Sequence, residues 1–419
     1  MKKKTKVILG VVIAVALIAA AIVGVVSHTI SKNAEQVGIA KLDVRRPIVS
    51  DDPNLLNVAL YPYVPDVGFM EEKCAEMFAG IAPGVKLNFV DWDCYSTNDV
   101  SNIDVFMYDS LFLDELYEQG SLQKLDLADF SNTDGLMDFI LDDTAFDENG
   151  EKAYYAIPDM ICSTFLIYKA DDQEMAAVEN IDDLYQLIGD VEHNGGSMKT
   201  DCLVTKFIDS YPYYYVDSLL DDKDPDIQDL AKHKDEILPN GTEHLSQIAR
   251  MSGKEQVEQS DFDFWMEGEF GKAEVFGKGY GRALFDYSEG MSSCQDHIDD
   301  IDLKLISLGS GENETFFYTD LLSINSSVTD PKKFENCQKL LDLLQSEEYI
   351  YQIGCGEGYP SYLLPARDNC YDRLAKQYPM YAEIDRELDQ ADKHVARYGT
   401  WFRDYINNLY DVLYDYITY

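Results

Sequence analysis

Apolar and polar positions alternate along the chain in the rhythm of strands and helices. Short apolar runs with β-branched or aromatic residues predict strands at 56–60, 85–90 and 103–108. Between these runs, apolar residues at helical spacing predict helices at 69–78 and 111–119. This β-α-β-α order favours a parallel sheet with helices on its faces, which is an α/β fold.

The alternation continues in the second half of the chain. Helices are expected at 181–188, 213–220, 244–251 and 331–344, and strands at 283–287, 303–308 and 316–325. The tail after residue 359 is expected to be mostly helical. The predicted exported part, residues 53–419, exceeds the usual size of one core, which indicates two lobes. We assign 53–160 and 308–345 to lobe 1, and 161–307 and 346–419 to lobe 2.

Residues 154–169 connect the two halves as two extended segments that meet at Cys162. Pro158 argues against a helix before this joint, and the apolar run at 165–168 predicts a strand after it. Such a crossover is typical of two-lobed solute-binding proteins, whose ligands lie in the cleft beside it. Two interpretations of Cys162 stay open: a small buried hydrophobe, or a thiol that faces a ligand.

The N-terminus predicts export. Residues 1–6 are basic, and residues 7–26 are apolar and uncharged over a length that can span a bilayer. A cleaved signal peptide and a signal anchor both fit, with residues up to 52 as a polar tether. The basic flank places the remainder outside, secreted or anchored to the outer face of the cytoplasmic membrane.

Charge and cysteine content narrow the possible partners. A net charge of −43 disfavours nucleic acid and anionic membranes, and it attracts small cations. The eight cysteines form no C-x-x-C pair and there are only six histidines, so a zinc site is not expected. Outside the cell some cysteines are expected to form disulfides, in a pairing that the sequence leaves open.

Aromatic and acidic residues follow the predicted strands. They are Tyr61, Tyr63, Asp91, Asp93, Tyr95 and Asp109. The carboxyl ends of parallel strands meet at one edge, where ligands of such folds bind, so we expect these side chains to converge. Glu289, beside Gly290, follows the strand expected at 283–287 and is placed to face the same cleft. For each residue alone, an ordinary turn position is an equally good interpretation.

Seven motifs carry a family resemblance. They are VALYPYVPD (58–66), DWDCY (91–95), DVFMYDS (104–110), IPDMIC (157–162), YSEGM (287–291), FYTD (317–320) and PSYLLPAR (360–367). In this order and combination the chain resembles thiaminase I (thiamine pyridinylase), a family of secreted enzymes with the two-lobed fold of type II periplasmic binding proteins. The motifs span nearly the whole exported region.

The resemblance implies specific roles. Cys162 corresponds to the family's nucleophile and Glu289 to the base that activates it. The substrate-binding residues that it implies are Tyr61, Tyr63, Tyr95, Asp109, Tyr287, Tyr318 and Asp320. Phe270 departs from the family, in which a further cleft tyrosine is expected. The resemblance also implies a monomer that needs no metal or organic cofactor and that acts on thiamine and an amine or thiol co-substrate.

The chemistry of these residues agrees with that expectation. Thiamine carries a permanent positive charge, which carboxylates attract and tyrosine rings bind through cation–π contacts. An acidic cleft raises the pKa of a thiol, so a nearby carboxylate must accept its proton. A non-catalytic protein that binds thiamine or another small cation could use the same acids and tyrosines without Cys162 and Glu289. A carbohydrate-binding protein would explain the aromatic residues but not the acids.

Overall fold

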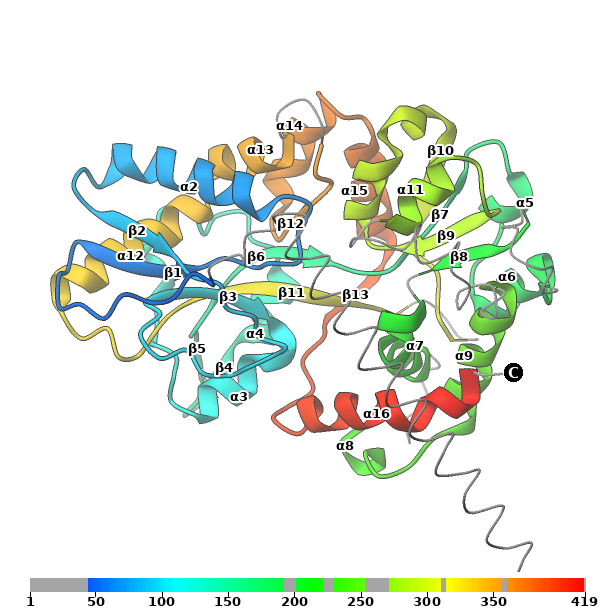
Figure 1. Ribbon diagram of the computed structural model, residues 1–419, viewed down its shortest axis with the longest axis horizontal. Helices are drawn as coiled ribbons and strands as arrows, with labels where there is room; N and C mark the ends of the chain where they lie inside the picture. The colour runs from blue at the N-terminus through cyan, green and yellow to red at the C-terminus, as the bar shows by residue number, and fades with distance from the viewer. Residues whose placement is uncertain are drawn as a thin grey trace, which may run out of the picture. The chain divides into compact units, whose positions relative to one another are not determined.

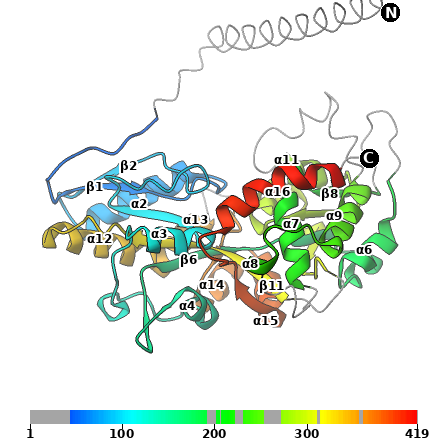
Figure 2. The same cartoon turned by 90° about the horizontal axis from the view of Figure 1, so that it is seen from below.

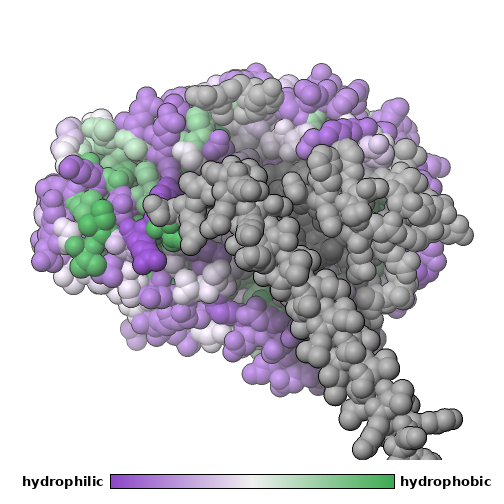
Figure 3. Space-filling model, viewed as in Figure 1, coloured by the Kyte–Doolittle hydropathy of each residue, from purple (hydrophilic) through white to green (hydrophobic). Residues whose placement is uncertain are grey.

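The computed structural model describes residues 44–191, 201–205, 207–221, 230–252, 271–309, 314–355 and 360–417. The chain divides into residues 1–45 and a compact unit from Arg46 to Tyr419, which carries the fold (Figures 1 and 2). The predicted signal segment at 1–26 and most of the tether that follows it up to residue 52 lie outside the described residues. Across the described ranges, no helix combines the length and the hydrophobicity needed to cross a bilayer. Among the residues that are coloured in Figure 3, hydrophilic ones predominate, in keeping with the net charge of −43.

The first sheet contains the strands predicted from the N-terminal half. Its order is β12 (Leu364–Pro365), β6 (Ile157–Cys162), β11 (Glu314–Ile324), β3 (Val105–Asp109), β1 (Leu55–Ala59) and β2 (Lys86–Phe89), and β13 (Asp392–Val395) also pairs with β11. As predicted, β1 is parallel to β2 and to β3. The long strand β11 is antiparallel to both β3 and β6, and it therefore occupies the middle of the sheet.

The second sheet forms a separate lobe. Its order is β10 (Ile301–Lys304), β7 (Phe165–Lys169), β9 (Ala283–Asp286) and β8 (Leu203–Thr205). A small hairpin of β4 (Phe146–Glu148) and β5 (Glu151–Ala153) stands apart from both sheets. Two sheets with their own helices confirm the predicted two-lobed α/β architecture.

Helices cover both sheets (Figure 1). Those of the first lobe are α2 (Val67–Ile81), α3 (Leu113–Glu118), α4 (Asp138–Thr144), α12 (Pro331–Leu344) and α13 (Glu347–Cys355). Those near the second sheet are α5 (Gln173–Ala176), α6 (Ile181–Ile188), α7 (Phe207–Asp221), α8 (Leu230–His233), α9 (Pro239–Ser252) and α11 (Gly271–Gly277). The C-terminal helices are α14 (Tyr371–Ala375), α15 (Met380–Gln390) and α16 (Phe402–Ile417). Apolar faces of these helices bury the core residues against the sheets.

The chain passes between the sheets at the predicted places. It leaves the first sheet at Cys162 and enters the second at Phe165, and it returns between Lys304 and Glu314. Cys162 thus ends a strand at the junction of the two lobes.

The C-terminal tail departs from its predicted assignment. Residues 346–419 were assigned to lobe 2, but β12 pairs with β6 and β13 pairs with β11, both in the first sheet. Helix α15 packs on β10, and α16 packs on α7 and α9, in the second lobe. The tail therefore crosses between the lobes repeatedly. Strands of two and four residues carry no periodic signal, which is why the sequence did not predict them.

Candidate active site

Three tyrosines cluster at the carboxyl ends of β1 and β2. Tyr61 is 8% exposed and Tyr63 is 41% exposed. The ring of Tyr63 lies edge-on to those of Tyr61 and Tyr95, with centroids 5.6 Å apart in each pair. The Tyr61 hydroxyl lies 3.4 Å from that of Tyr95. The ring of Tyr63 is therefore accessible, and behind it the hydroxyls of Tyr61 and Tyr95 form a buried pair.

The buried hydroxyls lead to Asp109, the last residue of β3. Tyr95 donates a hydrogen bond of 2.8 Å to Asp109 Oδ2, and the backbone N–H of Leu111 donates one of 2.9 Å to Oδ1. Burial raises the pKa of Asp109 to about 6, although these hydrogen bonds act in the opposite direction. Of the other predicted acids, Asp93 accepts a hydrogen bond from Tyr63, whereas Asp91 is exposed.

Strand pairing places Asp109, Asp320 and Cys162 on adjacent strands. Asp320 on β11 lies opposite Asp109 on β3, and Tyr318 lies opposite Cys162 on β6. The pKa of Asp320 is raised well above its ordinary value by burial, and further by the charges of Asp109 and Glu289. The middle of the sheet therefore presents carboxyl groups next to the cysteine at the lobe junction.

Cys162 differs from the other cysteines in exposure. It is half-buried, whereas the other seven are buried, and each of the eight is present as a thiol. The expected disulfides do not form. The hydroxyl of Ser163, the next residue, donates to the backbone carbonyl of Phe316 on β11 and fixes the joint. Burial is the first cause of the raised pKa of Tyr61 and of Tyr287, and the charge of Cys162 adds to both. The thiol therefore lies within electrostatic reach of one tyrosine from each lobe.

The second lobe contributes Tyr287 and Glu289, which follow β9 as predicted. Glu289 is 7% exposed, and the Ser288 hydroxyl lies 3.2 Å from Glu289 Oε2 and 2.8 Å from the backbone carbonyl of Tyr362. The charge of Glu289 raises the pKa of Asp320 in the first lobe. Glu289 is therefore coupled electrostatically to the acids at the end of the first sheet.

Helix α7 adds two residues that the sequence analysis missed. Tyr318 donates from its hydroxyl to the Asp217 carboxylate, at 3.0 Å from Oδ1 and 3.2 Å from Oδ2. The ring of Tyr213 lies edge-on to that of Tyr318 at 5.8 Å. Burial raises the pKa of Asp217 to about 7, against the lowering effect of the Tyr318 hydrogen bond. On this helix Tyr214 and Tyr215 are buried, whereas Tyr213 is half-buried. The i, i+4 spacing of Tyr213 and Asp217 was the available signal.

The C-terminal tail holds the first-lobe rim in place. Arg403 on α16 donates to the backbone carbonyls of Cys94 (2.8 Å) and Tyr95 (3.1 Å), and its Nε bonds to Glu115 at 2.7 Å. The Ser110 hydroxyl donates to the carbonyl of Ala396, beside Asp109. Residues 396–403 of the tail thus fix the backbone next to Tyr95 and Asp109.

Two further points of the sequence analysis concern Phe270 and metal binding. Phe270 lies outside the described residues. Over the described ranges, no three His, Cys, Asp or Glu side chains are grouped so that they could hold a metal ion.

Comparison with known proteins identifies the family. The model of the Thiaminase-1 domain matches residues 163–309. Thiaminase-1 of Paenibacillus thiaminolyticus is 30% identical over 373 residues, which are 83% of this chain and 86% of that protein. The chain belongs to the thiaminase I family. The structure of Clostridium botulinum thiaminase I in complex with thiamin superposes with a TM-score of 0.77 at 29% identity, over 86% of this chain and 99% of that one.

The wider structural likeness concerns the fold. The maltose-binding periplasmic protein MalE of Listeria monocytogenes has a TM-score of 0.58 at 16% identity, and the match covers 87% of this chain and 92% of that one. Thiaminase I proteins and this binding protein share the two-lobed arrangement, so the predicted type II periplasmic-binding-protein fold is confirmed.

Proposed function

We propose that this protein is a thiamine-degrading transferase that replaces the thiazole of thiamine with an amine or thiol. The observation that carries the proposal is the pairing of β3, β11 and β6, which aligns Asp109, Asp320 and Cys162 on adjacent strands at the lobe junction. Family membership and the thiamin complex of the Clostridium botulinum relative support the choice of substrate.

The acids provide the attraction for the substrate. Asp109, Asp320 and Asp217 are buried, and each has a raised pKa because burial disfavours its charge. When a permanently charged thiazolium enters the cleft, its charge offsets the free-energy cost of burying these carboxylates. Tyrosine rings such as Tyr61 and Tyr63 add cation–π contacts. The cleft therefore favours a flat cation over a neutral ring of the same size.

The proposed chemistry begins at Cys162. Glu289 accepts the thiol proton, and the thiolate adds to the electron-poor ring CH of the pyrimidine. The bond between the methylene carbon and the thiazolium nitrogen then breaks, and the electron pair leaves with a neutral thiazole. The acceptor forms a bond to the methylene carbon, the carbon–sulfur bond to Cys162 breaks, and the acceptor's proton is released. In this scheme the reaction has no step that needs a metal or an organic cofactor.

A direct assay tests the proposal. The purified protein is incubated with thiamine and aniline, and the loss of thiamine and the appearance of the anilino product are followed by mass spectrometry. Cys162→Ser should retain thiamine binding and lose turnover, whereas Cys355→Ser, which removes a buried thiol from α13, should retain both. Turnover by Cys162→Ser at the parent rate would exclude the covalent route. Binding without turnover by the parent protein would favour the alternative, a thiamine-binding protein.

The remaining properties are proposals of the same kind. We place the protein outside the cell, secreted or held at the membrane by its N-terminal segment, because of the basic and apolar pattern of residues 1–26. We propose that it acts as a monomer, since both lobes of one chain complete the cleft.

A further inference from the structure

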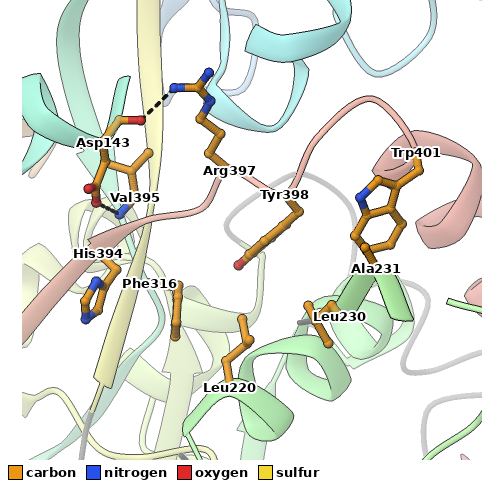
Figure 4. A pocket seen from close by; sticks show the side chains of 10 residues that line it. All are labelled: Asp143, Leu220, Leu230, Ala231, Phe316, His394, Val395, Arg397, Tyr398 and Trp401. Carbon is orange, nitrogen blue, oxygen red and sulfur yellow. Dashed lines mark hydrogen bonds between the residues drawn. The ribbon is translucent and has the colours of Figure 1, made fainter. Parts of the chain in front are cut away.

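A pocket of about 590 Å³ lies on the side of the molecule where the C-terminal tail crosses between the lobes (Figure 4). Four aromatic side chains line it: Phe316 from β11, His394 from β13, and Tyr398 and Trp401 from the segment that leads into α16. Its volume falls within the range of about 300–1,000 Å³ that is usual for small-molecule sites. None of these residues belongs to the catalytic set described above.

The pocket adjoins the cleft through elements that the two share. Phe316 precedes Tyr318 by two residues on β11, so both side chains point to the same face of that strand. Leu220, which also lines the pocket, follows Asp217 by three residues on α7, so the two share one face of that helix. The hydrogen-bonded pair of Tyr318 and Asp217 therefore lies on the same strand face and the same helix face as two residues that line the pocket.

Tyr398 links the pocket to the acids of the cleft. Its pKa is raised well above the ordinary value by burial, and further by the charges of Asp217, Asp109 and Asp221. Its hydroxyl is buried and has no hydrogen-bond partner among the described residues. In Figure 4 the hydroxyl end points toward Phe316 and Leu220 and away from Trp401. A buried polar group of this kind is stabilised when a ligand supplies its partner.

The walls favour a flat ring. The rings of Phe316 and His394 are stacked, with centroids 5.5 Å apart and planes at 28°. The ring centroid of Tyr398 lies 6.4 Å from that of Phe316. Side chains already packed in this way present ring faces and edges on which a further aromatic ring stacks. One hydroxyl amid aromatic walls suits a ring that carries one nitrogen able to donate or accept a hydrogen bond.

The charges disfavour an anion. Arg397, which is itself part of the lining, bonds through Nε and Nη2 to Asp114 and through Nη1 to the carbonyls of Asp143 and Ala145. Its guanidinium is thus engaged away from the ligand space, while the negative charges of the cleft act on Tyr398. A neutral or cationic ligand fits this field better than an anionic one.

We propose that this pocket binds the acceptor of the transfer reaction, a small aromatic amine, next to the cleft in which thiamine is cleaved. This inference rests on the proposed function. It adds that acceptor choice is set by Phe316, His394, Tyr398 and Trp401 and not by the thiamine-binding residues. The bond changes remain those of the transfer itself.

Ala231→Trp tests the pocket directly. Ala231 lines the pocket from α8 with an exposed side chain, so an indole there fills space without disturbing the core. The KM for aniline should rise at least about tenfold, whereas KM for thiamine and turnover with 2-mercaptoethanol, a small aliphatic acceptor, should stay at the parent values. Lys232→Trp, on the same short helix but not in the pocket lining, is the matched control. Equal effects on both acceptors, or none on aniline, would overturn the proposal.

A second variant and a second acceptor keep the test independent of one substitution. Tyr398→Phe removes the buried hydroxyl and should raise the KM for aniline about three- to tenfold without changing that for 2-mercaptoethanol. The parent enzyme should use 4-aminobenzenesulfonate, an anionic aniline, much less well than aniline, and an equal preference would contradict the charge argument. If the parent protein degrades no thiamine with any acceptor, the proposed function fails. If it degrades thiamine but these substitutions leave the KM values for both acceptors unchanged, only the proposal of an acceptor site is refuted.

Discussion

Asp109→Asn should stabilise the unliganded protein while it weakens thiamine binding. Asp109 is 1% exposed, and burial raises its pKa to about 6 from an ordinary value of 3.8. This difference corresponds to about 3 kcal/mol between the charged and neutral forms. Because the folded protein binds this proton more tightly than the unfolded chain, its contribution to stability is complete below pH 3.8 and is lost as the pH rises through 6.

The substitution removes the titrating group and keeps the shape of the side chain. An Asn side-chain oxygen can still accept the hydrogen bond from the backbone N–H of Leu111 that caps the following turn. The free energy of unfolding at pH 8 should therefore rise by up to about 3 kcal/mol, and at pH 3.5 it should stay near the parent value. Denaturant titrations of the unliganded protein at the two pH values measure both quantities.

Binding should change in the opposite direction. A carboxylate about 6 Å from a cation contributes about 3 kcal/mol at an effective dielectric constant near 20. Loss of that charge should weaken thiamine binding about 10- to 100-fold in calorimetric titrations and leave the neutral pyrimidine half nearly unaffected.

Asp126→Asn is the matched control. Asp126 is an exposed aspartate that caps a similar short turn by accepting from the N–H of Ala128, so its substitution should change neither stability nor binding by more than about 0.5 kcal/mol. A variant at Asp109 that gains no stability at pH 8, or that loses affinity equally for thiamine and the neutral half, would refute the reasoning.

Two other predictions concern the proton path and the lobe contact. Glu289→Gln should retain thiamine binding and slow turnover at pH 7, and its residual rate should climb with pH as solvent takes over removal of the Cys162 proton. A residual rate that does not change with pH would argue against Glu289 as the base. Tyr318→Phe removes a hydrogen bond to the buried Asp217 carboxylate and should cost about 1–3 kcal/mol of stability. Because the pKa of Asp217 is about 7, the loss should be larger at pH 8.5 than at pH 5.5, and denaturant curves with equal losses at both would contradict this account.

The elements that could be predicted carry strong local signals. The helix predicted at 181–188 has those bounds in the structure, and its N-cap, Asn180, accepts a hydrogen bond of 2.9 Å from the N–H of Asp183. The helix at 331–344 begins at a proline, a position that favours a helix start. Short-range chemistry of this kind depends on neighbours in the sequence alone.

The features that the sequence analysis did not predict depend on contacts between residues far apart in the chain. Nothing local indicates that residues 392–395 pair with residues 314–317 of β11, which lie 78 positions earlier in the chain. Tyr213 and Asp217 were missed because the helix they share has apolar residues on several faces, and only the docking of the lobes decides which face meets Tyr318. The strand-end residues Tyr61, Tyr95 and Asp109 were found because strand ends converge in any parallel sheet. Their catalytic and binding roles remain predictions.

The hydrogen bonds from Arg403 to the carbonyls of Cys94 and Tyr95 have a consequence for folding during synthesis. The strands of the first lobe are synthesised early, but the helix that fixes the backbone beside Tyr95 occupies residues 402–417, about 300 positions later in the chain than Tyr95. Strand β13 and the carbonyl of Ala396 that holds Ser110 also arrive late. A chain that stops short of these residues therefore lacks the contacts that hold the rim, even when Cys162 and Glu289 are already present. The order of synthesis therefore leaves the rim of the candidate cleft without these contacts until residues 402–417 have been made.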